Sequence, residues 1–393
     1  MNSRVCKWLV SFAVFFCLMF VAAGVAAKKP DNTGKPGMPD DPCSIEADFV
    51  PDFVFWRDST RKRVPQVTIY MASSADGCEK RLLDIPLADT GPIHDLKLSF
   101  GSYVEEEVFH GRVVWVRQVT GQAISVWKYD FSIKDGSLVT VSSPAPILIN
   151  QDLENRDINY IALSPNSETL AYQLTERFDY GTEYTIRTID IDSCDACTFI
   201  NGQIIGGLTD SLAKCDFLRS PVWGPLGQRV YVIQYESSSC YEVGSYTVKF
   251  RDLAEEDWEV LFTVDNPPDS LGQTDYRLVR TIASGIPSGC TEPYDCEYLA
   301  VQVSWTELSS CGNLHLARVN DCNGADDTCL SGPVIAGTNP SWTKNGELLH
   351  TYQGWTNRDS ETNCATNMVG MWDGTNLVSL LKGIEPTASS AQH

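Results

Sequence analysis

Residues 160–192 read YIALSPNSETLAYQLTERFDYGTEYTIRTIDID and contain three strand-sized segments. Residues 161–163 are a short apolar run, and SPNS at 164–167 is a turn in which Pro165 fixes φ and Asn166 tolerates left-handed geometry. A second apolar run, LAYQL, follows at 170–174, and residues 184–191 alternate with a period of two after a polar loop. The segment therefore predicts strand, tight turn, strand, loop, strand, and none of its residues is assigned to a functional site.

This unit recurs along the chain. Its second strand recurs at residues 53–56, 113–116, 170–174, 230–233, 299–303 and 348–352, and its third at 67–71, 125–131, 184–189, 246–250, 314–319 and 369–372. Between the markers Ile69, Trp127, Ile186, Val248, Leu316 and Met371 the steps are 58, 59, 62, 68 and 55 residues. Each step holds four strand-sized runs. Six such copies predict an all-β fold, a six-bladed β-propeller of four-stranded antiparallel blades.

The turn at 164–167 has counterparts in WGPLG at 223–227 and WTKNG at 342–346, each followed by an apolar strand. These turns resemble the repeats of TolB-like (WD40-like) propellers, in which an aromatic residue precedes a Ser-Pro-Asp-Gly-type turn. The likeness covers residues 155–200, 216–265 and 338–382, although no copy has the full Ser-Pro-Asp-Gly motif. The resemblance implies the fold, and by extension an envelope protein as partner, but none of that family's partner-binding residues matches a position here.

The N-terminal residues have the three parts of a secretory signal. Arg4 and Lys7 precede an uncharged apolar run at 8–21, and the small residues Val25-Ala26-Ala27 precede Lys28. We therefore predict a signal peptide at 1–27 that is cleaved after Ala27. The alternative is an uncleaved membrane anchor, which the apolar run disfavours because it is short for a membrane span. Residues 28–42, rich in Pro, Gly and charge, predict a disordered linker; the propeller is expected at 43–383 and a flexible tail at 384–393.

The cysteines favour disulfides. Removal of the signal leaves twelve, an even number in an exported chain: Cys43, Cys78, Cys194, Cys197, Cys215, Cys240, Cys290, Cys296, Cys311, Cys322, Cys329 and Cys364. Spacing suggests the pairs 43/78, 194/197, 215/240, 290/296, 311/364 and 322/329, although connectivity cannot be read from sequence. For the Cys194-Asp-Ala-Cys197 motif, a redox pair or half of a zinc site are alternatives. The context offers no βαβ unit and no second CxxC.

Charge limits the partners. After signal removal 28 basic residues face 51 acidic ones, a net charge of −23, which argues against nucleic acid and anionic membranes. We expect an exported monomer, in the bacterial periplasm or outside the cell, that is not an integral membrane protein after cleavage. The absence of Asn-x-Ser/Thr sites is consistent with a bacterial source.

No catalytic set is apparent. The chain has no G-x-S-x-G motif, and its histidines, His94, His110, His315, His350 and His393, do not occupy equivalent positions of different repeats. We therefore predict no catalytic residue, no cofactor and no metal cluster. One exception is left open, calcium at the loop residues Asp321, Asn323, Asp326 and Asp327, which lack EF-hand spacing.

Other charged clusters have structural interpretations. The acidic segment 190–195 is expected to be a solvated turn held by a disulfide, with an ion site as the alternative. Glu105-Glu106-Glu107 is expected to be a solvated loop. Arg61-Lys62-Arg63 is expected to be a charged hairpin tip, with an acidic partner patch as the alternative.

These observations predict a non-enzymatic binding or scaffolding module for a protein or glycan partner in the cell envelope. The mouth of the propeller, or cysteine-stapled loops at 236–246, 284–297 and 320–332, would form the recognition surface. The alternatives are a polysaccharide lyase or hydrolase with acidic or histidine residues at the central channel, and a structural propeller without a ligand. Ring closure stays open: residues 44–50 are assigned either to the inner edge of blade one or, preferably, beside residues 376–381 of blade six.

Overall fold

The structure is a computed structural model. It describes residues 49–59, 66–75, 77–86, 96–117, 124–149, 155–194, 197–211, 215–237, 244–266, 277–290, 295–304, 312–324, 326–352, 368–382 and 384–388. The chain divides into two units, Met1–Ser44 and Ile45–His393, and every described residue belongs to the second. No helix among these residues is long and apolar enough to span a membrane.

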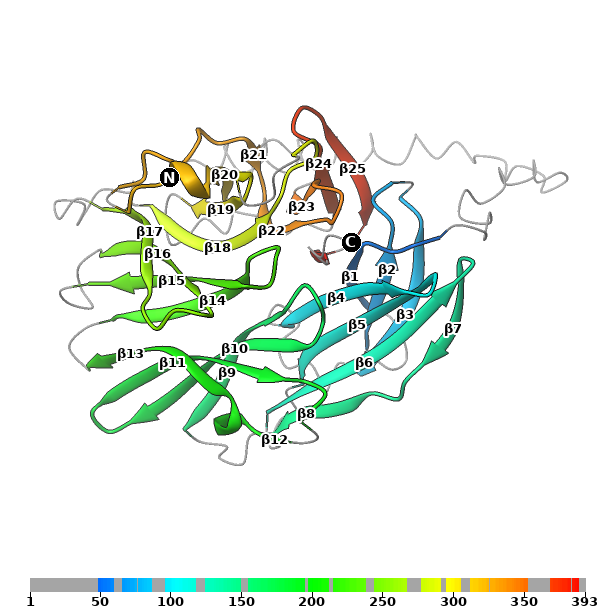
Figure 1. The fold of residues 1–393 in the computed structure, drawn as a ribbon, viewed down its shortest axis with the longest axis horizontal. Helices are drawn as coiled ribbons and strands as arrows, with labels where there is room; N and C mark the ends of the chain where they lie inside the picture. The colour runs from blue at the N-terminus through cyan, green and yellow to red at the C-terminus, as the bar shows by residue number, and fades with distance from the viewer. Residues whose placement is uncertain are drawn as a thin grey trace, which may run out of the picture. The chain divides into compact units, whose positions relative to one another are not determined.

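The second unit is a six-bladed β-propeller, as predicted (Figure 1). From the innermost strand outward, blade 1 holds β26 (Ile384–Ala388), β1 (Phe53–Ser59), β2 (Gln66–Ala72) and β3 (Glu79–Pro86). Blade 2 holds β4 (Leu98–Glu105), β5 (Val108–Arg117), β6 (Ser125–Lys134) and β8 (Ala145–Ile149), with β7 (Ser137–Val141) also on β6 and β12 (Cys197–Thr198) parallel to β8. Blade 3 holds β9 (Arg156–Leu163), β10 (Thr169–Phe178), β11 (Gly181–Asp190) and β13 (Gln203–Ser211).

The remaining blades follow the same order. Blade 4 holds β14 (Phe217–Trp223), β15 (Arg229–Glu236), β16 (Ser245–Asp252) and β17 (Glu259–Val264). Blade 5 holds β18 (Leu278–Gly285), β19 (Tyr298–Ser304), β20 (Asn313–Arg318) and β21 (Ile335–Ala336). Blade 6 holds β22 (Thr338–Trp342), β23 (Leu348–Tyr352), β24 (Met368–Trp372) and β25 (Leu377–Lys382). The predicted second and third strands of all six repeats thus coincide with observed strands.

Packing between blades explains the continuous apolar runs. In β10, Leu170, Tyr172 and Leu174 pack in a cluster with blade 2, whereas Ala171 packs in a cluster with blade 4. Similar clusters join blades 4 and 5, 5 and 6, and 6 and 1. A strand buried on both faces reads as an unbroken apolar run, because each of its faces meets another sheet.

The turn that defines the repeat has a common backbone. The amide of Ser167 donates to the Ser164 carbonyl at 2.8 Å, and the residue that takes positive φ is Ser167 (63°) rather than the predicted Asn166. Gly227 and Gly346 hold the same place in their turns, with φ of 70° and 82°. Asn166 instead accepts the Ser164 hydroxyl at 2.6 Å, so it stabilises the turn through its side chain.

Ring closure differs from the prediction. Residues 384–388, expected to belong to a tail, form β26, which pairs antiparallel with β1 and takes the inner edge of blade 1. That place is therefore not available to residues 44–50; Phe49 and Val50 are not in a strand, and the others lie outside the described residues. The segment TASS after Pro386 has a tail-like composition, and the strand arises only through pairing with an edge more than 300 residues earlier in the chain. Pro386 is tolerated because an innermost strand has a free edge.

Asp52, directly before β1, is buried with 4% exposure and accepts the backbone amide of Ser74 at 2.9 Å and the Ser74 hydroxyl. Burial raises the pKa of Asp52 to about 6, although the hydrogen bonds from Ser74 act in the opposite direction. The folded state therefore binds this proton more tightly than the unfolded chain.

A truncation tests ring closure. A chain that ends at Gly383 lacks β26, and we expect it to lose more than about 4 kcal/mol of unfolding free energy, beyond the range of ordinary point substitutions. A chain that ends at Ala388 keeps β26 and serves as the matched control. Guanidinium unfolding followed by tryptophan fluorescence measures both, and equal stability of the two chains would show that β26 does not close the ring.

A pH series tests the burial of Asp52. Because its folded pKa is raised, the unfolding free energy should fall as pH rises from about 4 to about 6, by up to about 3 kcal/mol from this group. Asp52→Asn should flatten that slope, whereas Glu105→Gln in an exposed turn should leave it unchanged. The measurement is the midpoint of denaturant unfolding at each pH, and an unaltered slope in Asp52→Asn would contradict the assignment.

Candidate functional site

A cavity of about 330 Å³ lies where the inner strands of the six blades meet. Each inner strand contacts the inner strands of the blades on either side of it, in the order β26, β4, β9, β14, β18, β22. The cavity is lined by residues 96–100 at β4, 160–163 of β9, 220–223 of β14, 281–284 of β18, 339–342 of β22, and Pro386 of β26. Residues 160–163, which the sequence did not single out for function, are therefore part of this site.

β-Bulges shape the cavity wall. In β14 two residues, Ser220 and Pro221, face one residue of β15. In the same way, Arg280 and Thr281 of β18 face one residue of β19. Asn339-Pro340 in β22 and residues 385–386 in β26 form equivalent interruptions, and β9 has a smaller shift. Bulges reorient side chains and recur next to functional sites. Here they line the cavity with Ser220, Thr281 and Asn339.

Two of the bulges hold strained backbone. Ser220 has φ of 56° and Asn339 has φ of 51°, and each precedes a proline, which further restricts its conformation. In blade 5 the buried Gln302 supports its neighbours: its Oε1 accepts the Thr281 hydroxyl at 2.9 Å and the Asn339 amide at 3.2 Å. The bulges of blades 5 and 6 are thus connected through one side-chain amide.

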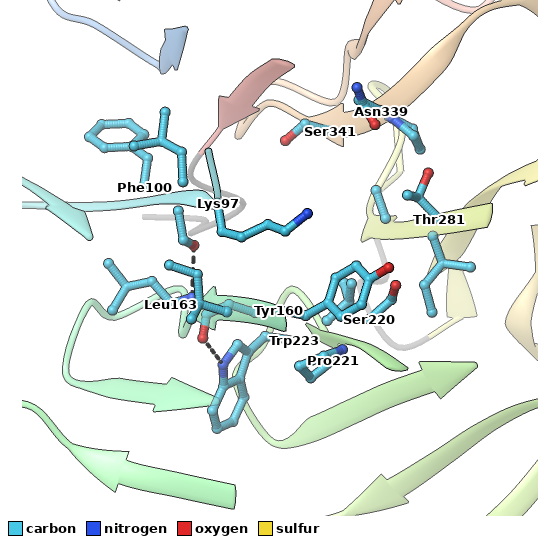
Figure 2. A pocket seen from close by; sticks show the side chains of 18 of the residues that line it. Lys97, Phe100, Tyr160, Leu163, Ser220, Pro221, Trp223, Thr281, Asn339 and Ser341 are labelled. Atoms are coloured by element: carbon cyan, nitrogen blue, oxygen red, sulfur yellow. Dashed lines mark hydrogen bonds between the residues drawn. The ribbon is translucent and has the colours of Figure 1, made fainter. Parts of the chain in front are cut away.

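The polar groups of the cavity are mostly neutral. Figure 2 shows the hydroxyls of Tyr160, Ser220, Thr281 and Ser341 around the opening, with the Lys97 ammonium extending between them. Lys97 Nζ lies 5.3 Å from the centre of the Tyr160 ring. The described lining contains no Asp, Glu or His.

The Ser220 hydroxyl has no internal partner. Its residue is only 5% exposed, and its Oγ makes no hydrogen bond within the described structure. Ser284, by contrast, donates to Glu297 at 2.8 Å, and burial raises the pKa of Glu297. The Ser284 hydroxyl is thereby oriented as an acceptor for a ligand, while Ser220 retains both roles.

The three described histidines do not converge on this cavity. His110 stacks on Tyr103 and lies 3.1 Å from the Ser132 hydroxyl, and His315 lies 2.9 Å from the Ser331 carbonyl oxygen. His350 is buried in β23, where burial lowers its pKa to about 4. His94 and His393 lie outside the described residues.

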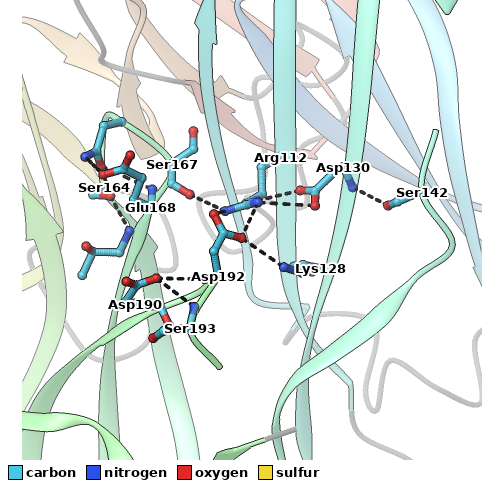
Figure 3. A network of polar contacts seen from close by, with 12 residues as sticks. Arg112, Lys128, Asp130, Ser142, Ser164, Ser167, Glu168, Asp190, Asp192 and Ser193 are labelled. Atoms are coloured by element: carbon cyan, nitrogen blue, oxygen red, sulfur yellow. Dashed lines mark hydrogen bonds and ion pairs between the residues drawn. The ribbon is translucent and has the colours of Figure 1, made fainter. Parts of the chain in front are cut away.

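The acidic segment after β11 joins two blades (Figure 3). Arg112 of β5 donates to Asp192 at 2.8 Å, to Asp130 at 2.6 Å and to the carbonyl of Ser167 at 2.7 Å. Lys128 lies 3.2 Å from Asp192, and together the two cations lower the pKa of this carboxyl against the effect of burial. The segment is therefore a contact between blades 2 and 3.

The calcium candidates are held differently. Asp327 pairs with Arg277 across the blade, and Asp326 accepts the backbone amide and the hydroxyl of Thr328. Asp321 lies 3.9 Å from Arg318. No group of three or more acidic, histidine or cysteine side chains suited to a metal occurs among the described residues. Calcium at Asp321, Asn323, Asp326 and Asp327 stays a prediction.

Three cysteine pairs are bonded: Cys194 with Cys197, Cys290 with Cys296, and Cys322 with Cys329. These match three pairs that spacing suggested. Cys78 and Cys215 are also disulfide-bonded, while their expected partners, Cys43 and Cys240, and the pair Cys311 and Cys364 lie outside the described residues.

Two charged candidates remain. Arg61-Lys62-Arg63 lies outside the described residues. Glu105, Glu106 and Glu107 are exposed at the β4–β5 turn, and the last two have φ of 49° and 64°.

The mouth of the propeller was one of the recognition surfaces expected from the sequence, but the residues that line the central cavity were not predicted, because their signal in the sequence is weak. The dipeptides Ser220-Pro221, Asn339-Pro340 and Glu385-Pro386 interrupt strand-like segments, and a proline within a strand marks a bulge or an edge. This signal identifies the bulged positions. It does not identify Lys97, which precedes β4 with no distinguishing pattern.

No protein-family model and no curated protein matches the chain. Among solved structures, the β-propeller domain of the Trilobed protease from Pyrococcus furiosus aligns at 12% identity and a TM-score of 0.39, with 85% of each chain covered. Acylaminoacyl peptidase from Pyrococcus horikoshii aligns at 12% and 0.39, and prolyl oligopeptidase B from Galerina marginata at 11% and 0.38.

The alignment with each of these two peptidases covers 84% of the present chain. The chain spans only 44% and 40% of their own lengths. The likeness concerns the propeller fold, and membership of the TolB-like family stays a prediction.

The strained bulge at Ser220 predicts a stabilising substitution. Ser220→Gly relieves the positive φ and removes a buried hydroxyl without a partner, so we expect a gain of about 1 kcal/mol in unfolding free energy. Ser220→Ala removes only the hydroxyl and should gain less. Asn339→Gly should also gain less, because asparagine tolerates left-handed backbone. Denaturant unfolding measures all three, and a loss of stability in Ser220→Gly would contradict the account.

Proposed function

We propose that this protein is an exported binding protein that holds one end of a glycan in its central cavity, without converting it. The observation that carries the proposal is the lining itself: hydroxyl, amide and aromatic side chains from the inner strands surround one small cavity. Sugars present hydroxyls around apolar ring faces. A cavity wall that combines polar and aromatic side chains binds both the hydroxyls and the ring faces.

The size of the cavity favours a chain end over a folded surface. About 330 Å³ is near the lower limit for ligand pockets, so it admits one or two sugar rings. Tyr160, Phe100 and the prolines at 221 and 340 offer apolar surface, while Thr281 and Asn339 offer polar atoms beside it.

Prolines in the inner strands disfavour an extended peptide as the ligand. A peptide that adds to a sheet edge needs a ladder of backbone donors and acceptors. Pro221, Pro340 and Pro386 remove backbone N–H groups from three of the inner strands at the cavity. Recognition therefore falls to side chains, which suits a polyhydroxylated ligand.

We also propose that the protein is exported and monomeric. The signal-like residues 1–27 and the disulfides fit an oxidising compartment, either the periplasm or the exterior. A monomer suffices because one chain supplies all six inner strands. For the lyase or hydrolase alternative, the described lining supplies none of the acidic or histidine groups that it requires.

Saturation-transfer NMR with defined sugars tests this function. The probes are glucose, galactose, mannose, N-acetylglucosamine, glucuronate and galacturonate, and we expect transfer to at least one. Thr281→Val should weaken that binding about 10-fold or more, because it removes a hydroxyl at the cavity together with its hydrogen bond to Gln302, which supports the neighbouring bulge of Asn339. Thr188→Val, outside the cavity, is the matched control.

Two outcomes would contradict the proposal. One is the absence of transfer to every sugar. The other is the appearance of cleaved products when oligosaccharides of a binding sugar are incubated with the protein, since this would make the site catalytic.

A further inference from the structure

Lys97 is the charged group of the cavity. It lies between the buried Leu96 and the start of β4, and its side chain extends over the Tyr160 ring into the cavity (Figure 2). Of the described residues that line the cavity, it is the only one with a formal charge.

This ammonium forms no ion pair with any described residue. Asp157 of β9 attracts it from beyond ion-pair distance, but that carboxylate lies 3.9 Å from Arg177. Partial removal of a charge from water is unfavourable unless a counter-charge is supplied. An anionic ligand would supply it, whereas a cationic ligand would be repelled.

Ser220 is an independent indication of a ligand at the same place. Its hydroxyl is buried, has no partner among the described residues and lines the cavity that Lys97 enters. Polar groups buried without a partner are rare in native proteins, and each calls for an explanation. A ligand oxygen that accepts from both Ser220 and Lys97 provides one.

We propose that the ligand is a sugar acid whose single carboxylate binds Lys97 and Ser220; this rests on the proposed glycan-binding function. One cation balances one carboxylate. Sulfate and phosphate esters are more often held by the planar fork of arginine or by several donors together, and no arginine lines the described cavity. Lys97 therefore selects among sugars by charge in a protein whose net charge is −21.

Two pairs of sugars that differ at C6 test the proposal. Glucose is compared with glucuronate and galactose with galacturonate, by calorimetry and saturation-transfer NMR. In at least one pair we expect the acid to bind about 10-fold or more tightly than its neutral partner, and that preference to weaken as sodium chloride is raised.

Substitutions at Lys97 test whether this residue causes the preference for the acid over the neutral sugar. Lys97→Met should abolish it while weaker binding of the neutral sugar continues, and Lys97→Arg should retain most of it. Thermal unfolding should show closely similar stability for the three proteins, since Lys97 forms no ion pair with any described residue.

The possible failures are distinct. If a neutral sugar binds as well as its acid, or if Lys97→Met keeps the preference, the inference is wrong while glycan binding stands. If mannose or N-acetylglucosamine binds but no sugar of either pair does, the sugar acid is refuted while glycan binding stands. If none of the six sugars binds, both the sugar acid and the glycan function are refuted.

Discussion

The pairing of β26 with β1 joins the two ends of the propeller, and the other contacts of the ring depend on it. Blades 3 to 6 each share an apolar cluster with the blade on either side, and the cluster between blades 6 and 1 would lose its partner in an open ring. The central cavity depends on the same pairing, because Pro386 of β26 is part of its wall. A short segment with few apolar residues thereby completes both the core and the site.

Rigid packing between blades allows strained geometry at the centre. Positive φ at Ser220 and Asn339, each before a proline, costs on the order of 1–3 kcal/mol per residue. The cluster around Trp223 and Val230 packs β14 and β15 of blade 4 against blade 3. Gln302 adds direct support by accepting from Thr281 and Asn339. The inner strands can therefore expose polar side chains that a regular strand would not direct to the channel.

The features that could be predicted from the sequence were the strands, because the same local pattern of apolar residues recurs in each repeat. The runs at 170–174 and 230–233 face sheets on both sides, so their apolar character marks the strand directly. β26 escaped prediction because its partner β1 lies more than 300 residues away and its own composition resembles a tail. Lys97 and Tyr160 escaped prediction because they belong to different blades and come together only when neighbouring blades pack. The prolines after Ser220 and Asn339 were the one visible trace of the site.

The acidic turn after β11, and the cysteine-stapled loop at 320–332 that the sequence favoured as recognition surface, each hold a carboxylate that is paired within the protein. Asp192 pairs with Arg112 of the neighbouring blade, and Asp327 pairs with Arg277. A carboxylate already paired to a fixed guanidinium gains little from binding a ligand, because the existing contact must first be broken. Ser220 and Lys97 have no such internal partners among the described residues, so a ligand there would replace only water. Polar groups that lack a partner among the described residues, rather than exposed side chains of the loops, therefore place the proposed site at the centre of the ring.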